Sequence, residues 1–221
     1  MRSLLGLAIV SACVLAPAVA RAQASVPAFN PDMSPDVLRA PIVATRRKGF
    51  MIGGTLALRV DSVSGYPTAF DKRNADFHVD MGTFLAPGGS VFIGGAISDY
   101  LALAFDLEFT NATHGGVHRR GSTFGLKILT WPLFDQGGVF RDLGLDATVG
   151  TGTANLSETA TGYSIASSGA FAFVATSISW EALRGGGFAV GPALGVDYRS
   201  SETYTAFATW LGVRGVYYAG P

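Results

Sequence analysis

The sequence predicts an all-β chain, namely an eight-stranded antiparallel up-and-down transmembrane β-barrel behind a cleaved export signal. Three observations predict it. Apolar residues alternate with small or polar residues at a period of two in eight segments. Connections of alternating length join these segments. Finally, only 14% of the 221 residues are charged while 29 are glycine, which argues against disorder and against helical bundles.

Residues 1–22 match a secretory signal peptide, with Arg2 before an apolar stretch and small residues at the cleavage position. We expect cleavage after Ala22, which would remove Cys13, the single cysteine of the chain. The segment Val10–Cys13 is similar to a bacterial lipobox. Because the residues after Cys13 stay apolar, an ordinary cysteine is the favoured interpretation.

Residues 23–48 predict an irregular periplasmic lead-in, because its prolines prevent both a ladder and a long helix. The lead-in ends in Arg46-Arg47-Lys48, the densest basic run, which we expect to be a solvated linker end. The barrel domain is expected over residues 49–221. The chain has 16 basic and 16 acidic residues, so nothing in its charge predicts a nucleic-acid partner.

The clearest strand is expected over residues 100–110. Leu101, Leu103, Phe105, Leu107 and Phe109 share one face of it. Its length is close to the ~9–11 residues that a tilted strand needs to cross a bilayer. The same alternation predicts strands at 50–60, 124–128, 142–149, 188–197 and 206–214, and more weakly at 89–97 and 166–180.

The connections predict which ends of the strands carry loops. Short connections are expected at Ile97–Tyr100, 132–138 and 181–186, and longer ones at 61–88, 111–121 and 151–165, with 199–203 as a short exception. The longer ones are rich in Thr, Ser, Gly and Asn. Long loops outside and short turns in the periplasm are typical of an outer-membrane barrel.

Two arguments predict that the apolar face looks outward. The interior of an eight-stranded barrel is just wide enough for side chains to fill, so the Leu and Phe residues of all strands would overcrowd it. The other face is Ala and Gly with about one charge per strand, which makes a poor solvent face. The alternative is an exported soluble, lipocalin-like barrel that binds an apolar ligand.

The chain resembles the small eight-stranded outer-membrane β-barrel family (the OmpA-like and OmpX-like porin superfamily) over residues 49–218. The resemblance rests on the signal peptide before this segment, on the alternation and on turns such as Ile97–Leu103. The resemblance implies a monomer in the cell outer membrane with a structural, narrow-pore or surface-interaction role and no cofactor. Its implied partners are outer-membrane lipids including lipopolysaccharide, and the barrel assembly machinery. Family members commonly end in an aromatic residue, whereas here Tyr217-Tyr218 precedes Ala219-Gly220-Pro221.

The charges within the strands fall on the face that we expect to line the lumen. They are Arg59, Asp106, Glu108, Lys127, Asp146, Asp197 and Arg214. Unpaired buried charges are costly, so we expect a paired network. Such a network predicts a polar plug, and the alternative is a water path with a charged constriction.

A second cluster lies in the expected loop 111–121 and beside it. Arg119 and Arg120 could contact lipopolysaccharide phosphates, because arginine pairs well with phosphate. A lipid A-modifying enzyme would need His118, Ser122 and Glu108 together, which is a weaker hypothesis. We predict no catalytic residue and no metal site. For Trp131 and Trp180 the sequence predicts places in an interfacial aromatic girdle.

Overall fold

The computed structural model describes residues 46–136 and 138–220 of the chain. The predicted signal peptide, the question of Cys13 lipidation and the lead-in up to residue 45 lie outside the described residues. The strands are β1 (Gly49–Gly65), β2 (Val79–Ala96), β3 (Leu101–His114), β4 (Val117–Thr130), β5 (Leu143–Glu158), β6 (Ser164–Trp180), β7 (Leu183–Gly185), β8 (Phe188–Ser200) and β9 (Tyr204–Ala219). Four short 3-10 turns accompany them: η1 (Asp71–Arg73), η2 (Ala75–Phe77), η3 (Phe134–Gln136) and η4 (Gly138–Asp142).

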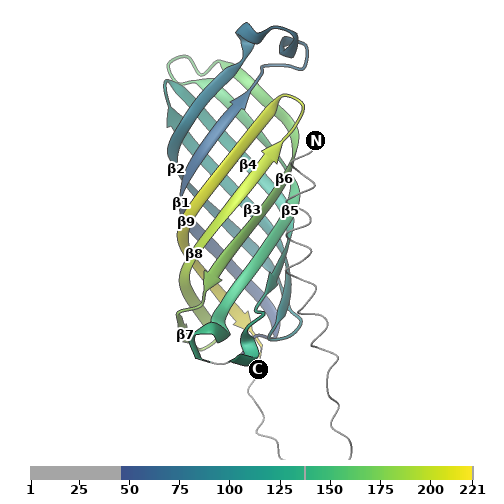
Figure 1. Ribbon diagram of the computed structural model, residues 1–221, viewed down its shortest axis with the longest axis vertical. Helices are drawn as coiled ribbons and strands as arrows, with labels where there is room; N and C mark the ends of the chain where they lie inside the picture. The colour runs from purple at the N-terminus through teal and green to yellow at the C-terminus, as the bar shows by residue number, and fades with distance from the viewer. Residues whose placement is uncertain (1–45, 137, 221) are drawn as a thin grey trace, which may run out of the picture. The chain divides into compact units, whose positions relative to one another are not determined.

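The eight long strands form a closed antiparallel barrel, so the predicted fold class is confirmed (Figure 1). Neighbours in sequence pair with each other, β9 pairs back to β1, and pairing of β6 with β8 completes the ring. β7 is a three-residue extension that pairs only with the start of β8. Closure leaves no long free edge, which is the condition for spanning lipid with strands.

The direction of the side chains agrees with the predicted orientation. On β3, Leu107 is 46% exposed, whereas the neighbouring Asp106 is buried inside the barrel. The same alternation of exposed apolar and buried polar side chains runs along β1 and β4. An apolar exterior around charged residues contradicts the lipocalin-like alternative, because a soluble barrel would show the opposite arrangement. In the part of the chain that the structure describes, no helix is long and apolar enough to span a membrane.

The strands are longer than predicted, and the three expected longer loops lie for the most part within strands. The expected loop 111–121 is a hairpin that turns at Gly115 and Gly116, both of which have positive φ. The expected loop 151–165 has only residues 159–163 outside the strands, and 61–88 only residues 66–78. The exposed apolar side chains of the strands, such as Leu58, Leu107 and Phe109, form an apolar band around the barrel. Beyond this band the outward side chains become polar, so the alternation in hydrophobicity fades although the strand pairing continues.

The two ends of the barrel therefore differ. We call the end with residues 66–78, 115–116, 159–163 and 201–203 the loop end. The opposite end, with residues 97–100, 131–142 and 181–187 and both ends of the described chain, is the turn end. The largest connection, residues 66–78, carries η1 and η2 at the loop end (Figure 1).

The interior also contains large apolar side chains, which the volume argument did not anticipate. One cluster near the loop end includes Phe84, Leu156 and Phe171, and another near the turn end includes Met51 and Phe92. Glycines on neighbouring strands make room for them. A Cβ atom at Gly152 would lie 2.8 Å from the Phe171 ring, for example.

Candidate functional site: a charged belt inside the barrel

All seven charged residues predicted to line the lumen are buried inside the barrel. Each comes from a position where its strand turns the small or polar face inward, as on β1, where Thr55, Ala57 and Arg59 alternate with Leu56 and Leu58. Three further charged residues, Asp61, Arg119 and Arg199, join them. We call these ten residues the charged belt.

Six members of the belt form one continuous network. Arg59 contacts Asp61, Glu108 and Asp197, the last two from β3 and β8. Arg199 reaches the same Glu108 carboxylate at 2.6 Å and Asp197 at 3.1 Å. Arg119 closes the network by pairing with Asp61. Every carboxylate here therefore faces two cations.

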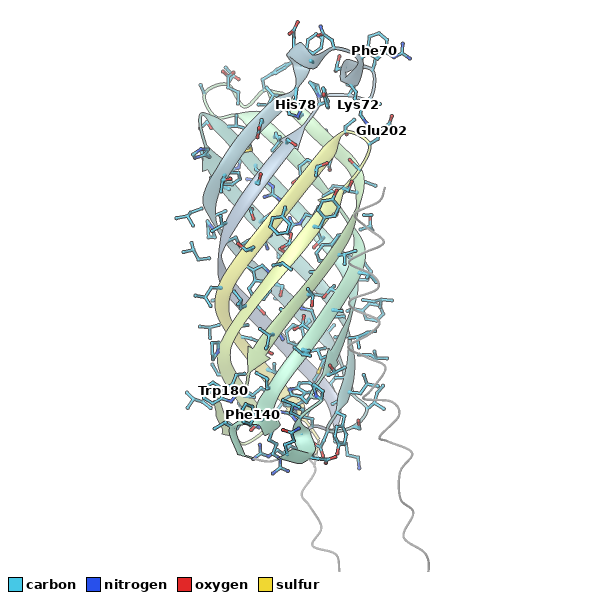
Figure 2. The ribbon with its side chains drawn as sticks, viewed as in Figure 1. Phe70, Lys72, His78, Phe140, Trp180 and Glu202 are labelled. Atoms are coloured by element: carbon cyan, nitrogen blue, oxygen red, sulfur yellow. The ribbon has the colours of Figure 1, made fainter. Side chains whose placement is uncertain are left out.

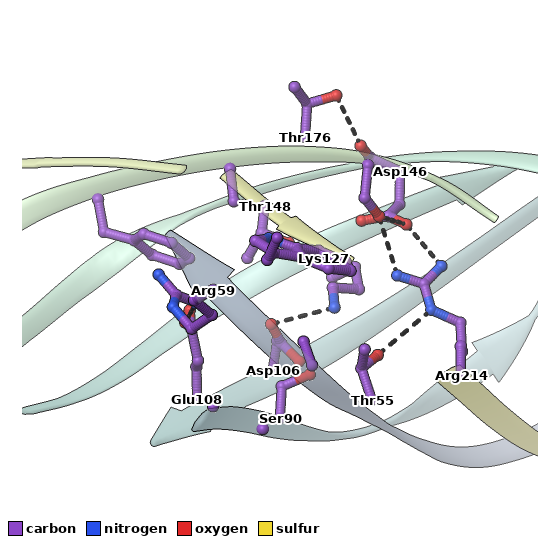
Figure 3. Close-up of a pocket in the computed structure, with 17 residues that line it drawn as sticks. Thr55, Arg59, Ser90, Asp106, Glu108, Lys127, Asp146, Thr148, Thr176 and Arg214 are labelled. Carbon is purple, nitrogen blue, oxygen red and sulfur yellow. Dashed lines mark hydrogen bonds and ion pairs between the residues drawn. The ribbon is translucent and has the colours of Figure 1, made fainter. Parts of the chain in front are cut away.

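The other four members form two separate pairs (Figure 3). The Arg214 guanidinium donates to Asp146 at 2.6 Å and to the hydroxyls of Ser177 and Ser179 at 3.0 Å. Lys127 lies 3.1 Å from Asp106 and above the Phe92 ring, with its Nζ 4.9 Å from the ring centroid. The second oxygen of Asp106 has no hydrogen-bond partner among the described residues.

The belt is electrically balanced, with five basic and five acidic side chains, all of them in ion pairs. The missed residues bring this balance about, because the seven predicted ones are three basic and four acidic. A sequence signal for two of them existed: Asp61 and Arg199 lie two residues beyond Arg59 and Asp197, on the same face of longer strands. A balanced belt has no net charge with which to favour permeant ions of one sign.

The cavity beside the charged belt is small. A cavity of about 40 Å³ lies against Asp106, Lys127, Arg214 and Trp210, which is room for a few water molecules. Along β1 the belt lies between Met51 of the apolar cluster near the turn end and Val63 of the cluster near the loop end. Along this strand, apolar side chains thus follow the charged belt toward both ends of the barrel.

A second buried cluster closes the turn end, and it corrects the expectation for Arg46-Arg47-Lys48. Arg47 is fully buried rather than solvated. Its guanidinium lies 2.7 Å from Glu181 and 2.8 Å from Asp142, and its centre is 4.2 Å from the centroid of the Trp131 ring. The backbone N–H groups of Arg46 and Arg47 both donate to Asp99, at 2.7 and 2.8 Å. We call this cluster the mouth clamp.

The mouth clamp ties the start of β1 to every connection at the turn end. Arg46 pairs with Asp142 at 2.6 Å, Arg184 pairs with both Asp142 and Glu181, and the Tyr218 hydroxyl donates to Glu181. Burial disfavours the charge of Arg47, but the nearby acidic groups, Glu181 first and Asp142 with it, together outweigh this and raise the arginine pKa. Burial likewise disfavours the charged form of Asp142, yet Arg46 and Arg47 hold its pKa below the usual value.

Trp131 is not in an interfacial girdle. It is 2% exposed and faces inward beneath Arg47, because Trp131 follows the last residue of β4 and turns into the mouth. Trp180 is 40% exposed and lies on the outside. The sequence could not distinguish the two, since both stand at strand ends.

The predicted loop cluster is divided between the two faces of β4. Arg119 points into the barrel and pairs with Asp61, so it is not available to a phosphate outside. Arg120 is exposed. The structure does not bring together the three residues of the weaker enzyme hypothesis: Ser122 faces outward, Glu108 faces inward, and the His118 ring contacts Thr113. Among the described residues, no group of three or more His, Cys, Asp or Glu side chains could hold a metal ion.

No protein-family model matches this sequence. No curated protein matches it either. Solved structures of small eight-stranded outer-membrane barrels match the structure of this chain.

Three of these structures show the extent of the likeness. Neisserial surface protein A (NspA) is 13% identical, over 75% of this chain and 96% of that one, with a TM-score of 0.48. Ail, the attachment invasion locus protein of Yersinia pestis, is 9% identical over 77% and 99%, with a TM-score of 0.49. Outer membrane protein AlkL is 10% identical over 87% and 99%, with a TM-score of 0.40. At these values the likeness is one of general architecture.

Proposed function

We propose that this chain is a monomeric outer-membrane β-barrel with a sealed lumen. It acts through the surface that it presents at the membrane, in a structural or surface-interaction role, and not as a pore or an enzyme. One observation carries the proposal: a charge-balanced belt of ten paired side chains, with apolar side chains toward both ends, leaves a cavity of only about 40 Å³. Ion flow needs a continuous water path. The barrel assembly machinery would insert such a chain, as it does other barrels of this kind.

The experiment is single-channel recording of the purified protein in a planar bilayer, with a large porin as positive control. We expect no conductance steps under conditions in which the porin conducts. Stable, reproducible openings would refute the sealed lumen. Membrane fractionation tests the location separately, because a freely soluble product would contradict a membrane barrel of any kind.

A contact with lipid phosphate is the part of this proposal that concerns partners. Arg120 is the one Lys or Arg in the eight long strands, as described, whose side chain points outward. Its register partners on β3 and β5 are the exposed amides Asn111 and Asn155. Phe109, one outward position below Asn111, belongs to the apolar band. A guanidinium just beyond this band lies at the depth of phosphate groups, which arginine binds with two hydrogen bonds.

Arg120→Ala tests this contact, with Arg73→Ala in the connection 66–78 as a matched exposed cation. Vesicles that contain lipid A, vesicles of phosphatidylglycerol and vesicles of phosphatidylcholine separate the sources of phosphate. We expect Arg120→Ala to weaken retention of lipid A during detergent washing while Arg73→Ala does not. Equal retention by both variants and the unmodified protein would remove the contact.

A further inference from the structure

The lipid-facing band is placed asymmetrically along the barrel. At the turn end it starts, on five of the eight long strands, with the first outward side chain, namely Phe50, Leu101, Leu143, Trp180 and Phe188. At the loop end a polar margin separates the band from the connections, with Ser62, Asn111, Arg120, Asn155 and Thr205 as its outward side chains. The water interface at the turn end must therefore coincide with the turns themselves.

Those turns carry exposed apolar side chains that continue the band. Ile97, Val139, Phe140 and Leu183 are 62%, 63%, 55% and 72% exposed; we call these four residues the foot. The backbone of Ile97 hydrogen-bonds that of Leu101, and Leu183 is the register partner of the outward Val190.

Phe140 is joined to the band in the same way. It lies in η4, which runs directly into β5 at Leu143, and Leu143 is the register partner of Trp180. Figure 2 shows Phe140 and Trp180 at the same end of the barrel. Three of the connections at this end thus extend the apolar exterior beyond the strands.

The connection 132–142 is amphipathic: it buries one aromatic side chain and exposes Val139 and Phe140 of the foot. Phe134 is 7% exposed and packs inside, edge-on to Tyr100 at 5.2 Å and under the Arg141 guanidinium at 4.5 Å. Val139 and Phe140, a few residues later, point out. The carboxylates of Asp99 and Asp142, in contrast, are turned inward to Arg46 and Arg47. These two carboxylates are thus turned away from the outside of this end, while Val139 and Phe140 are displayed there.

Exposed apolar side chains also occur at the loop end, but there they are not continuous with the band. Phe70 and Phe77 are 73% and 49% exposed, yet the polar margin separates them from the band. Phe70 and Lys72 lie at the far end of the barrel from Phe140 (Figure 2).

We infer that the foot inserts into the phospholipid leaflet at the turn end. The barrel then sits with its turn end immersed in the interface and its loop end projecting beyond the opposite leaflet. Apolar and aromatic side chains at this depth gain by leaving water while the nearby backbone can still be hydrated. The inference rests on the proposed membrane barrel and adds its depth and its second anchoring surface.

Single-cysteine spin labels test the depth in vesicles of phosphatidylcholine and phosphatidylglycerol. Cys13→Ser provides a cysteine-free background, since Cys13 is the only cysteine. Labels at Phe140→Cys and Leu183→Cys are compared with one at Asp135→Cys, which is exposed in the same connection as Phe140. Collision rates with oxygen, which concentrates in lipid, and with a nickel chelate, which stays in water, are measured for each.

We expect the oxygen-to-nickel ratio at Phe140 and Leu183 to exceed that at Asp135 several-fold, and a label at Phe70→Cys to match Asp135. A label at Leu107→Cys on the middle of β3 separates the two levels of the proposal. If Leu107 reports lipid while Phe140 and Leu183 report water, the foot is refuted and the membrane barrel stands. If Leu107 also reports water, the membrane barrel itself is refuted.

Discussion

The pair formed by Lys127 and Asp106 offers the sharpest test of the charged belt. Within residues 46–136 and 138–220, each has the other as its only ion-pair partner; Lys127 Nζ and Asp106 Oδ2 are 3.1 Å apart, and both side chains are 5% exposed. Lys127→Met removes the cation and leaves a buried carboxylate alone. Removing one partner of a buried pair costs about 3–5 kcal/mol. We expect the lower part of that range, because the adjoining cavity of about 40 Å³ has room for water to solvate Asp106.

The double variant Lys127→Met/Asp106→Leu should recover most of this loss. Replacing a buried ion pair by apolar side chains of similar volume is often neutral or stabilising by about 1–4 kcal/mol. The free energy of unfolding of both variants is measured by urea titration in detergent micelles, with the fluorescence of the buried Trp131 as one probe. A double variant no more stable than Lys127→Met would refute the idea that an orphaned charge, rather than lost packing around Phe92, is what destabilises the barrel.

Further tests concern the mouth clamp and the lipid face. Arg47→Met should destabilise the barrel by about 3 kcal/mol, since Glu181 and Asp142 keep other cations; the exposed Lys48→Met is the matched control, and equal urea midpoints would contradict a clamp. Because the folded pKa of Asp142 lies below its usual value of about 3.9, its contribution is present above that pH and lost as the pH falls through the folded pKa. The unmodified protein should therefore lose thermal stability toward pH 3 more steeply than Asp142→Asn. Parallel curves of melting temperature against pH would contradict this expectation. Leu107→Arg should cost about 2–4 kcal/mol and lower the inserted fraction on heat-modifiable gels, whereas Asn111→Arg beyond the band should cost about 0–1; similar losses would misplace the band.

The alternation of side chains was enough to predict the fold and the seven inner charges, because a strand's two faces are defined by neighbouring residues alone. Arg59, Asp106 and Lys127 needed only a strand and a phase to be placed inside. Their partners needed more. Asp61 and Arg199 were missed because the outward residues beside them are no longer clearly apolar, so the strands appeared to end too early.

The mouth clamp was beyond any local pattern. Arg47 and Glu181 are 134 residues apart, and only closure of the ring places them together. An arginine run before a strand is usually solvated, and nothing near Arg47 in sequence shows that two carboxylates and an indole will enclose it. Trp131 was misplaced for the same reason: a residue at a strand end turns inward or outward according to the connection that follows.

The sequence by itself determined the strand count, the antiparallel order and which face of each strand meets lipid, since all three follow from a period of two and the spacing of turns. Only the tertiary structure decided whether the lumen is filled. That depends on side chains from β1, β3, β4, β5, β8 and β9 meeting across the barrel, where charge balance, ring-on-glycine packing and the register of distant strands act together. Register is set by the closure of the whole sheet, so the sequence of a single strand does not determine it.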